Sequence, residues 1–153
     1  MAEEFDQLQD ELQEMVLAEA RKLYSEVVID HAMNPRNAGE MNDADGYGNA
    51  TGSCGDDMEI WLRVRNGTIA DAGFWTNGCS TTIASGSMIT EMAKGKPVME
   101  AKKISQHDVL TALDGLPADS EHCAQLAVNT LKEAIKDYLK LQREPWKKAY
   151  RKN

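Results

Sequence analysis

Five side chains of this sequence could together hold a metal. Cys54 lies in the glycine-rich stretch GSCGD, two residues before Asp56, and Cys79 lies in the stretch NGCST. His122 directly precedes Cys123 in the stretch SEHCAQLA. Three thiolates with one oxygen and one nitrogen donor would satisfy a tetrahedral zinc ion with one group to spare, or supply one edge of an iron–sulfur cluster.

The spacing of these residues leaves other roles for the thiols open. No Cys-x-x-Cys pair is present, so the patterns of a zinc ribbon and a bacterial ferredoxin are excluded. A free cysteine is often a buried small apolar residue, and it can also be a reactive nucleophile. Glycine neighbours at Cys54 and Cys79 favour exposed turns over burial. Asp56 is a common turn residue, yet in an extended chain it would project to the same side as Cys54.

Composition limits the class of protein. A chain of 153 residues is long enough for one domain with a hydrophobic core, and 42% hydrophobic with 27% charged residues is typical of a globular protein. The net charge of -8 argues against nucleic acid or an anionic membrane as a partner. The acidic N-terminal sequence has no apolar signal segment. We therefore expect a cytoplasmic location, where reducing conditions disfavour disulfides.

The elements that position the five residues can be read from hydrophobic periodicity. Apolar residues at spacings of three and four predict one long helix over residues 3–33. Alternation from Met58, the turn pair Asn66-Gly67 and the stretch TIADAGFWT predict an antiparallel hairpin, and the glycine-rich stretch 46–55 predicts a loop with at most a short strand. Helices are expected after Cys79, at 105–113 and from Ser120 to Glu144. The order predicts an α+β fold, with helices on one face of a small antiparallel sheet.

These elements give two of the thiols a favourable setting. Cys79 falls at the start of one predicted helix, and Cys123 falls in the first turn of another. Unpaired backbone N–H groups and the positive end of the helix dipole stabilise a thiolate there. Because the thiolate is the form that binds metal or attacks sulfur, both positions favour chemistry over inert packing.

Four ordered motifs resemble the IscU/NifU-type iron–sulfur cluster scaffold proteins. They are LYSEVVIDHAMNPRNAGEM, GSCGD, NGCSTTIASGSMITEMAKGK and EHCAQLA, and the resemblance covers roughly Leu23 to Leu139. It implies an IscU/NifU N-terminal-like fold with a three-stranded sheet. It also implies a scaffold rather than an enzyme, without catalytic residues. A cysteine desulfurase would deliver sulfur, a transient [2Fe-2S] cluster would form, and apo-proteins would receive it.

The resemblance also assigns roles to the five residues. Cys54, Cys79 and Cys123 match the three site cysteines of the family, and Asp56 and His122 match the residues that compete for the fourth ligand position. A [4Fe-4S] cluster could form by pairing two scaffolds in a homodimer, and zinc could occupy the same residues in the apo form. The alternative is a zinc-dependent persulfide acceptor. Such relatives carry an insertion between the second and third cysteines and lack the histidine, whereas 43 residues separate Cys79 from Cys123 here and His122 is present.

Two segments depart from the family pattern. Relatives that use a dedicated Hsp70/J-protein chaperone pair carry Leu-Pro-Pro-Val-Lys before the His-Cys pair, whereas this chain has Leu-Pro-Ala-Asp-Ser at 116–120. We therefore do not expect chaperone-assisted release. The N-terminal segment lies outside the resemblance. We expect it to be either a solvated helix or a contact surface for a second copy or a desulfurase. The expected organisation is an acidic helical extension at 1–22, a scaffold domain at 23–143 and a basic tail at 144–153.

Overall fold

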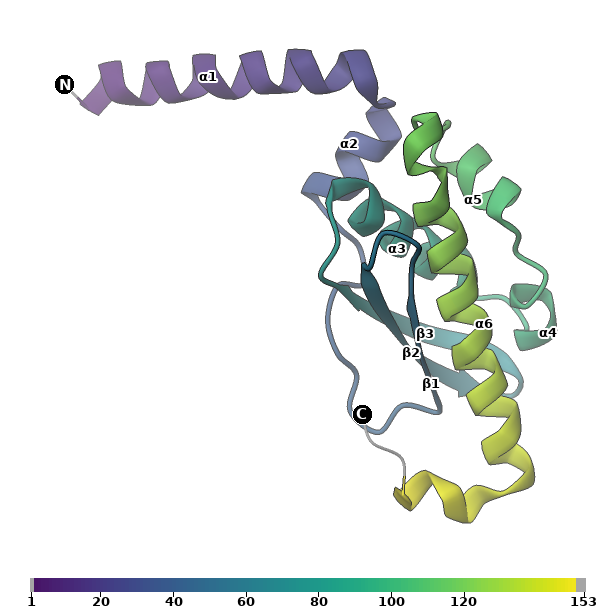
Figure 1. Cartoon of the computed structure of the whole chain (residues 1–153). Helices are drawn as coiled ribbons and strands as arrows, with labels where there is room; N and C mark the ends of the chain where they lie inside the picture. The colour runs from purple at the N-terminus through teal and green to yellow at the C-terminus, as the bar shows by residue number, and fades with distance from the viewer. Residues whose placement is uncertain (1, 151–153) are drawn as a thin grey trace.

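Three strands form one antiparallel sheet (Figure 1). The computed structural model describes residues 2–150. Its strands are β1 (Gly46–Thr51), β2 (Asp57–Arg65) and β3 (Thr68–Thr76), in the order β1-β2-β3. Both neighbouring pairs run antiparallel. The predicted α+β fold with a three-stranded sheet is confirmed.

The β2–β3 hairpin follows directly from its sequence. Met58, Ile60 and Leu62 alternate along β2, and all three side chains are fully buried. Asn66 and Gly67 have φ angles of 54° and 77°, the pair of positive values that a tight two-residue hairpin turn requires. The alternating pattern and the Asn-Gly pair together therefore fix the register of the hairpin.

Strand β1 is better formed than the sequence indicated. The glycine-rich stretch predicts at most a short strand, yet all six residues of β1 pair with β2. A glycine explains the difference, because β1 lies directly against helix α6 (Glu121–Arg143). A Cβ on Gly48 would lie 2.3 Å from the backbone nitrogen of Ala134 and 2.7 Å from the carbonyl oxygen of Thr130. Glycine here allows close backbone approach rather than a flexible loop.

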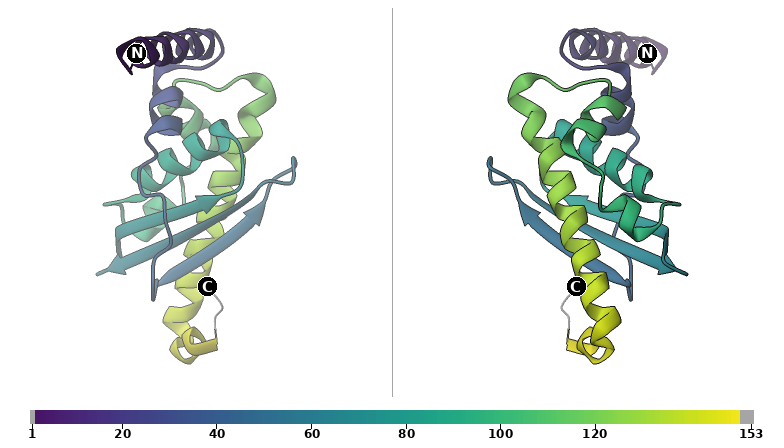
Figure 2. Two further views of the ribbon diagram at one scale, coloured as in Figure 1. Left: turned by 90° about the vertical axis from the view of Figure 1, so that its left-hand side faces the viewer. Right: turned by 90° about the vertical axis from the view of Figure 1, so that its right-hand side faces the viewer.

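Helices α3 (Ser80–Ala93) and α6 cover one face of the sheet (Figure 2). Helix α4 (Val98–Ala101) and helix α5 (Gln106–Ala112) follow α3, and the short 3₁₀ turn η1 (Ala118–Ser120) leads into α6. The capping box predicted between Ser105 and Asp108 is present at the start of α5. The α6 side chains that enter the core are Ala124, Leu126, Ala127, Val128, Leu131, Ala134 and Ile135.

The prediction of one helix over residues 3–33 is wrong. The chain forms α1 (Ala2–Leu23) and α2 (Glu26–Met33), and they separate at Ser25. The Ser25 hydroxyl accepts a hydrogen bond from the Val28 N–H and donates one to the carbonyl oxygen of Leu113. Serine stabilises a new helix start in this way, so α2 can turn and pack on α3 while α1 extends away from the body (Figure 1).

The chain beyond α6 is held to the body by charge. The 3₁₀ segment η2 (Pro145–Tyr150) follows α6. Lys148 forms salt bridges of 3.1 Å with Asp43 and 3.7 Å with Asp45. Residues 151–153 of the predicted basic tail lie outside the described residues. Over residues 2–150, no helix is both long enough and apolar enough to cross a membrane.

Candidate metal centre

Three separate elements carry the three cysteines. Cys54 lies in the tight turn between β1 and β2. Cys79 is the N-cap residue of α3, directly after the end of β3. Cys123 lies in the first turn of α6. All three are free thiols; Cys54 and Cys79 are exposed and Cys123 is buried.

Two threonine hydroxyls join Cys79 to Cys123. The Thr81 Oγ1 atom lies 3.2 Å from the Cys79 Sγ and 3.4 Å from the Cys123 Sγ. The Thr82 Oγ1 atom lies 3.4 Å from the Cys123 Sγ and 3.8 Å from the Cys79 Sγ. Both threonines are buried. The starts of α3 and α6 therefore hold these two thiols against one polar pair of hydroxyls.

Asp56 joins the same network from the β1–β2 turn. The Thr82 hydroxyl donates a 3.0 Å hydrogen bond to the Asp56 Oδ2. Gly78 makes room for this contact, because a Cβ there would lie 2.7 Å from the Thr82 Oγ1 and 2.8 Å from the Asp56 Oδ2. The glycine before Cys79 therefore lets the carboxylate approach the start of α3.

His122 links the remaining thiol to the network. Its Nε2 lies 2.9 Å from the Cys54 Sγ and 3.8 Å from the Cys123 Sγ. Contacts thus run from Cys54 through His122 to Cys123, and through the threonines to Cys79 and Asp56. The structure brings all five residues selected from the sequence to one place.

The chain between Cys54 and Asp56 is not extended. Gly55 has a φ angle of 85°, the Gly55 N–H donates to the Gly52 carbonyl, and the Gly52 N–H donates to the Asp56 carbonyl. The expectation that Cys54 and Asp56 project to one side of an extended chain therefore does not apply. The turn directs the thiol to His122 and the carboxylate to Thr82.

The five donors are near one another without forming a closed coordination shell. Among residues 2–150, no three His, Cys, Asp or Glu side chains are arranged as a ready metal site. Hydroxyl groups stand between Cys79, Cys123 and Asp56 instead. Some of the five side chains must therefore turn before they can bind a common ion or cluster.

The environment of Cys79 favours its thiolate. The hydroxyl of Thr81 donates a hydrogen bond to the sulfur, and this is the largest effect that lowers the pKa of Cys79 below its ordinary value. Partial burial opposes the shift, and contacts from Thr82 add to it. Thr81 and Thr82 were missed from the sequence. Their position two and three residues after the helix-starting Cys79, in CSTT, was the available signal.

Comparison with known proteins gives the family. The family model of the NifU-like N terminal domain matches residues 23–145. The chain belongs to this family. A relative from Archaeoglobus fulgidus, named iron-sulfur cluster assembly scaffold protein IscU 1, is 48% identical over 119 residues, covering 77% of this chain and 78% of the relative. The Escherichia coli protein named iron-sulfur cluster assembly scaffold protein IscU is 44% identical over 120 residues, covering 75% of this chain and 93% of its own length.

A solved structure shares the fold. The N-terminal part of a nitrogen-fixing NifU-like protein from Brucella abortus superposes with a TM-score of 0.61. The superposition covers 76% of this chain and 94% of the other, at 15% sequence identity. The predicted IscU/NifU N-terminal-like fold is thus confirmed. Helix α1 lies outside the residues that the family model matches, except for its last residue, Leu23.

Proposed function

We propose that this protein is a scaffold on which an iron–sulfur cluster is assembled and from which the cluster passes to apo-proteins. The observation that carries the proposal is the network at the starts of α3 and α6, where three free thiols, a carboxylate and an imidazole are gathered. The NifU-like family and the names of the relatives support the same function. The cluster is the cargo of such a protein, and no catalytic residue is required.

The proposed ligands are the thiolates of Cys54, Cys79 and Cys123. A [2Fe-2S] cluster needs four protein ligands, so one more donor must come from Asp56 or His122. Two contacts support these candidates, since Asp56 contacts the hydroxyl that joins Cys79 to Cys123 and His122 lies between Cys54 and Cys123. Carboxylate oxygen and imidazole nitrogen are harder ligands than thiolate and exchange more readily on iron. A fourth ligand that exchanges readily suits a scaffold, because the cluster must leave it for an apo-protein.

The partners follow from what assembly needs. We propose a cysteine desulfurase as the sulfur donor, with a separate reductant supplying the electrons that convert sulfane sulfur to sulfide. The exposed thiols of Cys54 and Cys79 are accessible to such a donor. Apo iron–sulfur proteins would receive the cluster. A reducing compartment such as the cytoplasm would keep all three thiols free.

The experiment that tests the proposal is anaerobic reconstitution of the full chain. Iron, cysteine, a cysteine desulfurase and dithiothreitol are added, and visible absorption is combined with iron and sulfide analysis. The proposal predicts equal amounts of bound iron and sulfide, which Cys54→Ser, Cys79→Ser and Cys123→Ser each abolish. His122→Ala tests whether the imidazole is the fourth ligand, and His107→Ala, which removes an exposed histidine from α5, is its control.

A second outcome would favour the zinc-dependent sulfur-transfer alternative. In that case the protein retains zinc, one cysteine carries a persulfide, and no cluster absorption develops. A [4Fe-4S] cluster shared by two chains contains two irons per chain, as one [2Fe-2S] cluster on each chain does, so visible absorption and the mass of the loaded protein distinguish the two forms. The Hsp70/J-protein pair is left out of the proposal, because Ala118 and Ser120 replace the second proline and the lysine of the chaperone motif.

A further inference from the structure

Helix α1 presents an apolar surface that its own chain does not cover. Phe5, Leu8, Leu12 and Met15 follow one another at spacings of three and four, and each is more than half exposed. No residue of α1 is buried. A different face of the helix is directed toward α2, where Gln13, Val16, Leu17 and Ala20 line a small pocket between the two helices. An exposed apolar stripe of this length on a helix indicates a partner surface.

The charge of α1 indicates what that partner must carry. Seven acidic residues lie on the helix, and its two basic residues, Arg21 and Lys22, are at the C-terminal end in salt bridges with Glu26 and Glu19. At 100° per residue, Glu4 and Glu11 lie along one edge of the apolar stripe, whereas Asp6 lies on the face that is directed toward α2. Two α1 stripes placed face to face would bring like charges together. The stripe therefore fits a surface with an apolar floor and a cationic edge.

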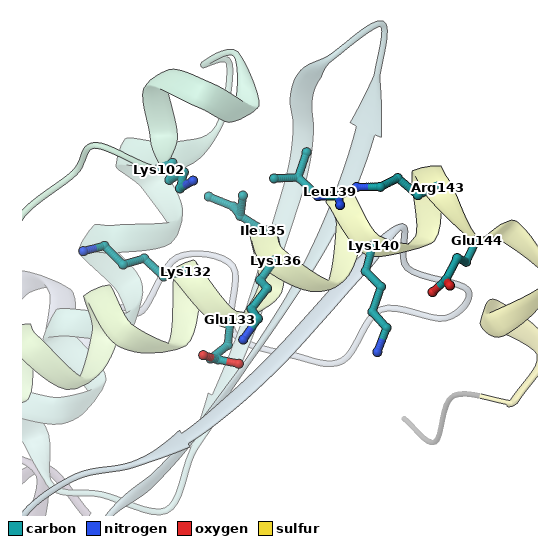
Figure 3. A pocket seen from close by; sticks show the side chains of 9 residues that line it. All are labelled: Lys102, Lys132, Glu133, Ile135, Lys136, Leu139, Lys140, Arg143 and Glu144. Atoms are coloured by element: carbon teal, nitrogen blue, oxygen red, sulfur yellow. The ribbon is translucent and has the colours of Figure 1, made fainter.

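The same chain carries such a surface on the C-terminal half of α6. A groove of about 590 Å³ lies between this part of α6 and the end of α4. The half-buried Leu139 provides the accessible apolar floor, with the buried Ile135 beneath it, and Figure 3 shows both side chains on the side of α6 that faces Lys102. The cationic residues around the floor are Lys102, Lys132, Lys136, Lys140 and Arg143.

The cations of the groove are available to an acidic partner. All five are exposed, and within residues 2–150 none of them forms a salt bridge. Two acidic residues, Glu133 and Glu144, also line the groove, and Glu144 already pairs with Lys147 at 2.6 Å. The groove therefore has a net positive charge in a protein whose net charge is -8.

We propose that the apolar stripe of α1 from one copy docks into the α6 groove of a second copy. The lengths agree, because Phe5 to Met15 spans about 15 Å along α1 and Lys132 to Arg143 about 16 Å along α6 at 1.5 Å per residue. The acidic edge of the stripe, formed by Glu4 and Glu11, then faces the lysines of the rim. Helix α1 leaves the body beside α2, whereas the groove lies on the far half of α6, so the fold keeps the helix away from its own groove (Figure 1). Reciprocal exchange between two copies uses both helices and both grooves and closes as a dimer.

Sedimentation velocity of the full chain tests this contact. Over a concentration series at low ionic strength, the mass should rise from 16.9 kDa toward twice that value. Added salt should weaken the association, because salt screens exposed charges. Leu8→Glu with Leu12→Glu on the helix, and Lys132→Glu with Lys136→Glu in the groove, should each give a monomer. Lys136→Gln with Lys140→Gln is a milder groove variant, because it removes two charges without reversing them. Circular dichroism checks that every variant folds.

Two control variants and one mixture separate this proposal from other contacts. Gln7→Glu with Gln9→Glu adds the same charge to α1 outside the stripe, and Lys96→Glu with Lys103→Glu reverses two cations outside the groove; both should still dimerise.

The helix variant mixed with the groove variant should form a heterodimer through the one intact helix and the one intact groove. Pairing of α1 with α1 predicts the opposite, namely a groove variant that dimerises with itself and no heterodimer in the mixture. A wild-type protein that stays monomeric, or a groove variant that still dimerises, would overturn the proposal.

Discussion

The two sides of the candidate metal centre differ in how firmly they are held. On the packed side, which comprises Cys79, Thr81, Thr82 and Cys123, three of the four residues are at most 2% exposed and hydroxyl contacts join both thiols. On the open side, which comprises Cys54 and His122, the thiol lies in an exposed turn. Helices position the first side, whereas on the second side a short loop positions Cys54 and the first turn of α6 positions His122.

This difference indicates how cargo can be both held and released. Buried side chains at the starts of two helices keep their places when no metal is bound, since their backbone belongs to the core. The turn that carries Cys54 is closed by only two backbone hydrogen bonds at its base, between Gly52 and Asp56 and between Gly55 and Gly52. Exposed turns open at low free-energy cost. Iron and sulfur would therefore arrive and leave on the Cys54 side.

Gly78→Ala should give the largest effect, because it forces the packed side apart. The added methyl group would meet Thr82 at 2.7 Å and the Asp56 carboxylate at 2.8 Å. We expect the free energy of unfolding of the apo-protein to fall by about 1–3 kcal/mol, as overpacking of a well-packed site does. Urea denaturation followed by circular dichroism measures it.

The control for Gly78→Ala lies on the open side. Cys54→Ala removes an exposed sulfur and should change the free energy of unfolding by less than about 0.5 kcal/mol. If Cys54→Ala destabilised the protein as much as Gly78→Ala, the two sides would not differ in the way described.

Thr82→Val should give a smaller effect, since it keeps the shape of the side chain and removes one hydroxyl. The buried hydroxyl of Thr82 donates to Asp56 at 3.0 Å, and its loss should cost about 1 kcal/mol of unfolding free energy. Thr51→Val removes a similar bond, at 2.6 Å to Asp57, from an exposed position and should cost less. Equal losses in the two variants would contradict the idea that burial distinguishes the two bonds.

Thr81→Val should give the smallest effect, and it concerns protonation rather than stability. The Thr81 hydroxyl stabilises the Cys79 thiolate, so its removal should raise the pKa of Cys79 toward its ordinary value. The rate of alkylation of Cys79 by iodoacetamide would then reach its half-maximum at a higher pH than in the wild type, as measured by mass spectrometry of the peptide. Ser80→Ala, in the same helical turn, is the control. An unchanged pH profile in Thr81→Val would show that the Thr81 hydroxyl does not stabilise the Cys79 thiolate.

Much of the fold could be predicted because its patterns are local. Alternation in β2 and the Asn66-Gly67 pair gave the hairpin, and the Ser105–Asp108 box gave the start of α5. The break at Ser25 was missed, since both helices continue one apolar period and the cap is completed by Leu113, which is distant in sequence. Strand β1 was underestimated because its glycine serves contact with α6, and this contact is visible only in three dimensions.

The candidate site, like the fold, was predicted from the sequence only in part. Residue type selected Cys54, Asp56, Cys79, His122 and Cys123, and the structure gathers them in one network. Thr81 and Thr82 were not selected, because their position in CSTT is a weak signal and a hydroxyl near a thiol is recognised mainly by distance. The turn at Gly55 also depends on hydrogen bonds that the sequence does not reveal. Which donor completes the ligand set therefore depends on how the side chains move when the cluster forms.

The central claim is that the cluster is cargo, held by three thiolates and one exchangeable ligand. The most direct test is the transfer of a reconstituted cluster to an apo-ferredoxin, followed anaerobically by circular dichroism for the wild type and for Asp56→Ala. We predict that the wild type passes its cluster on intact and that Asp56→Ala retains it longer, because the carboxylate that favours exchange is absent. Equal rates of cluster loss in the two proteins, or iron and sulfide appearing in solution before they appear in the acceptor, would contradict this account.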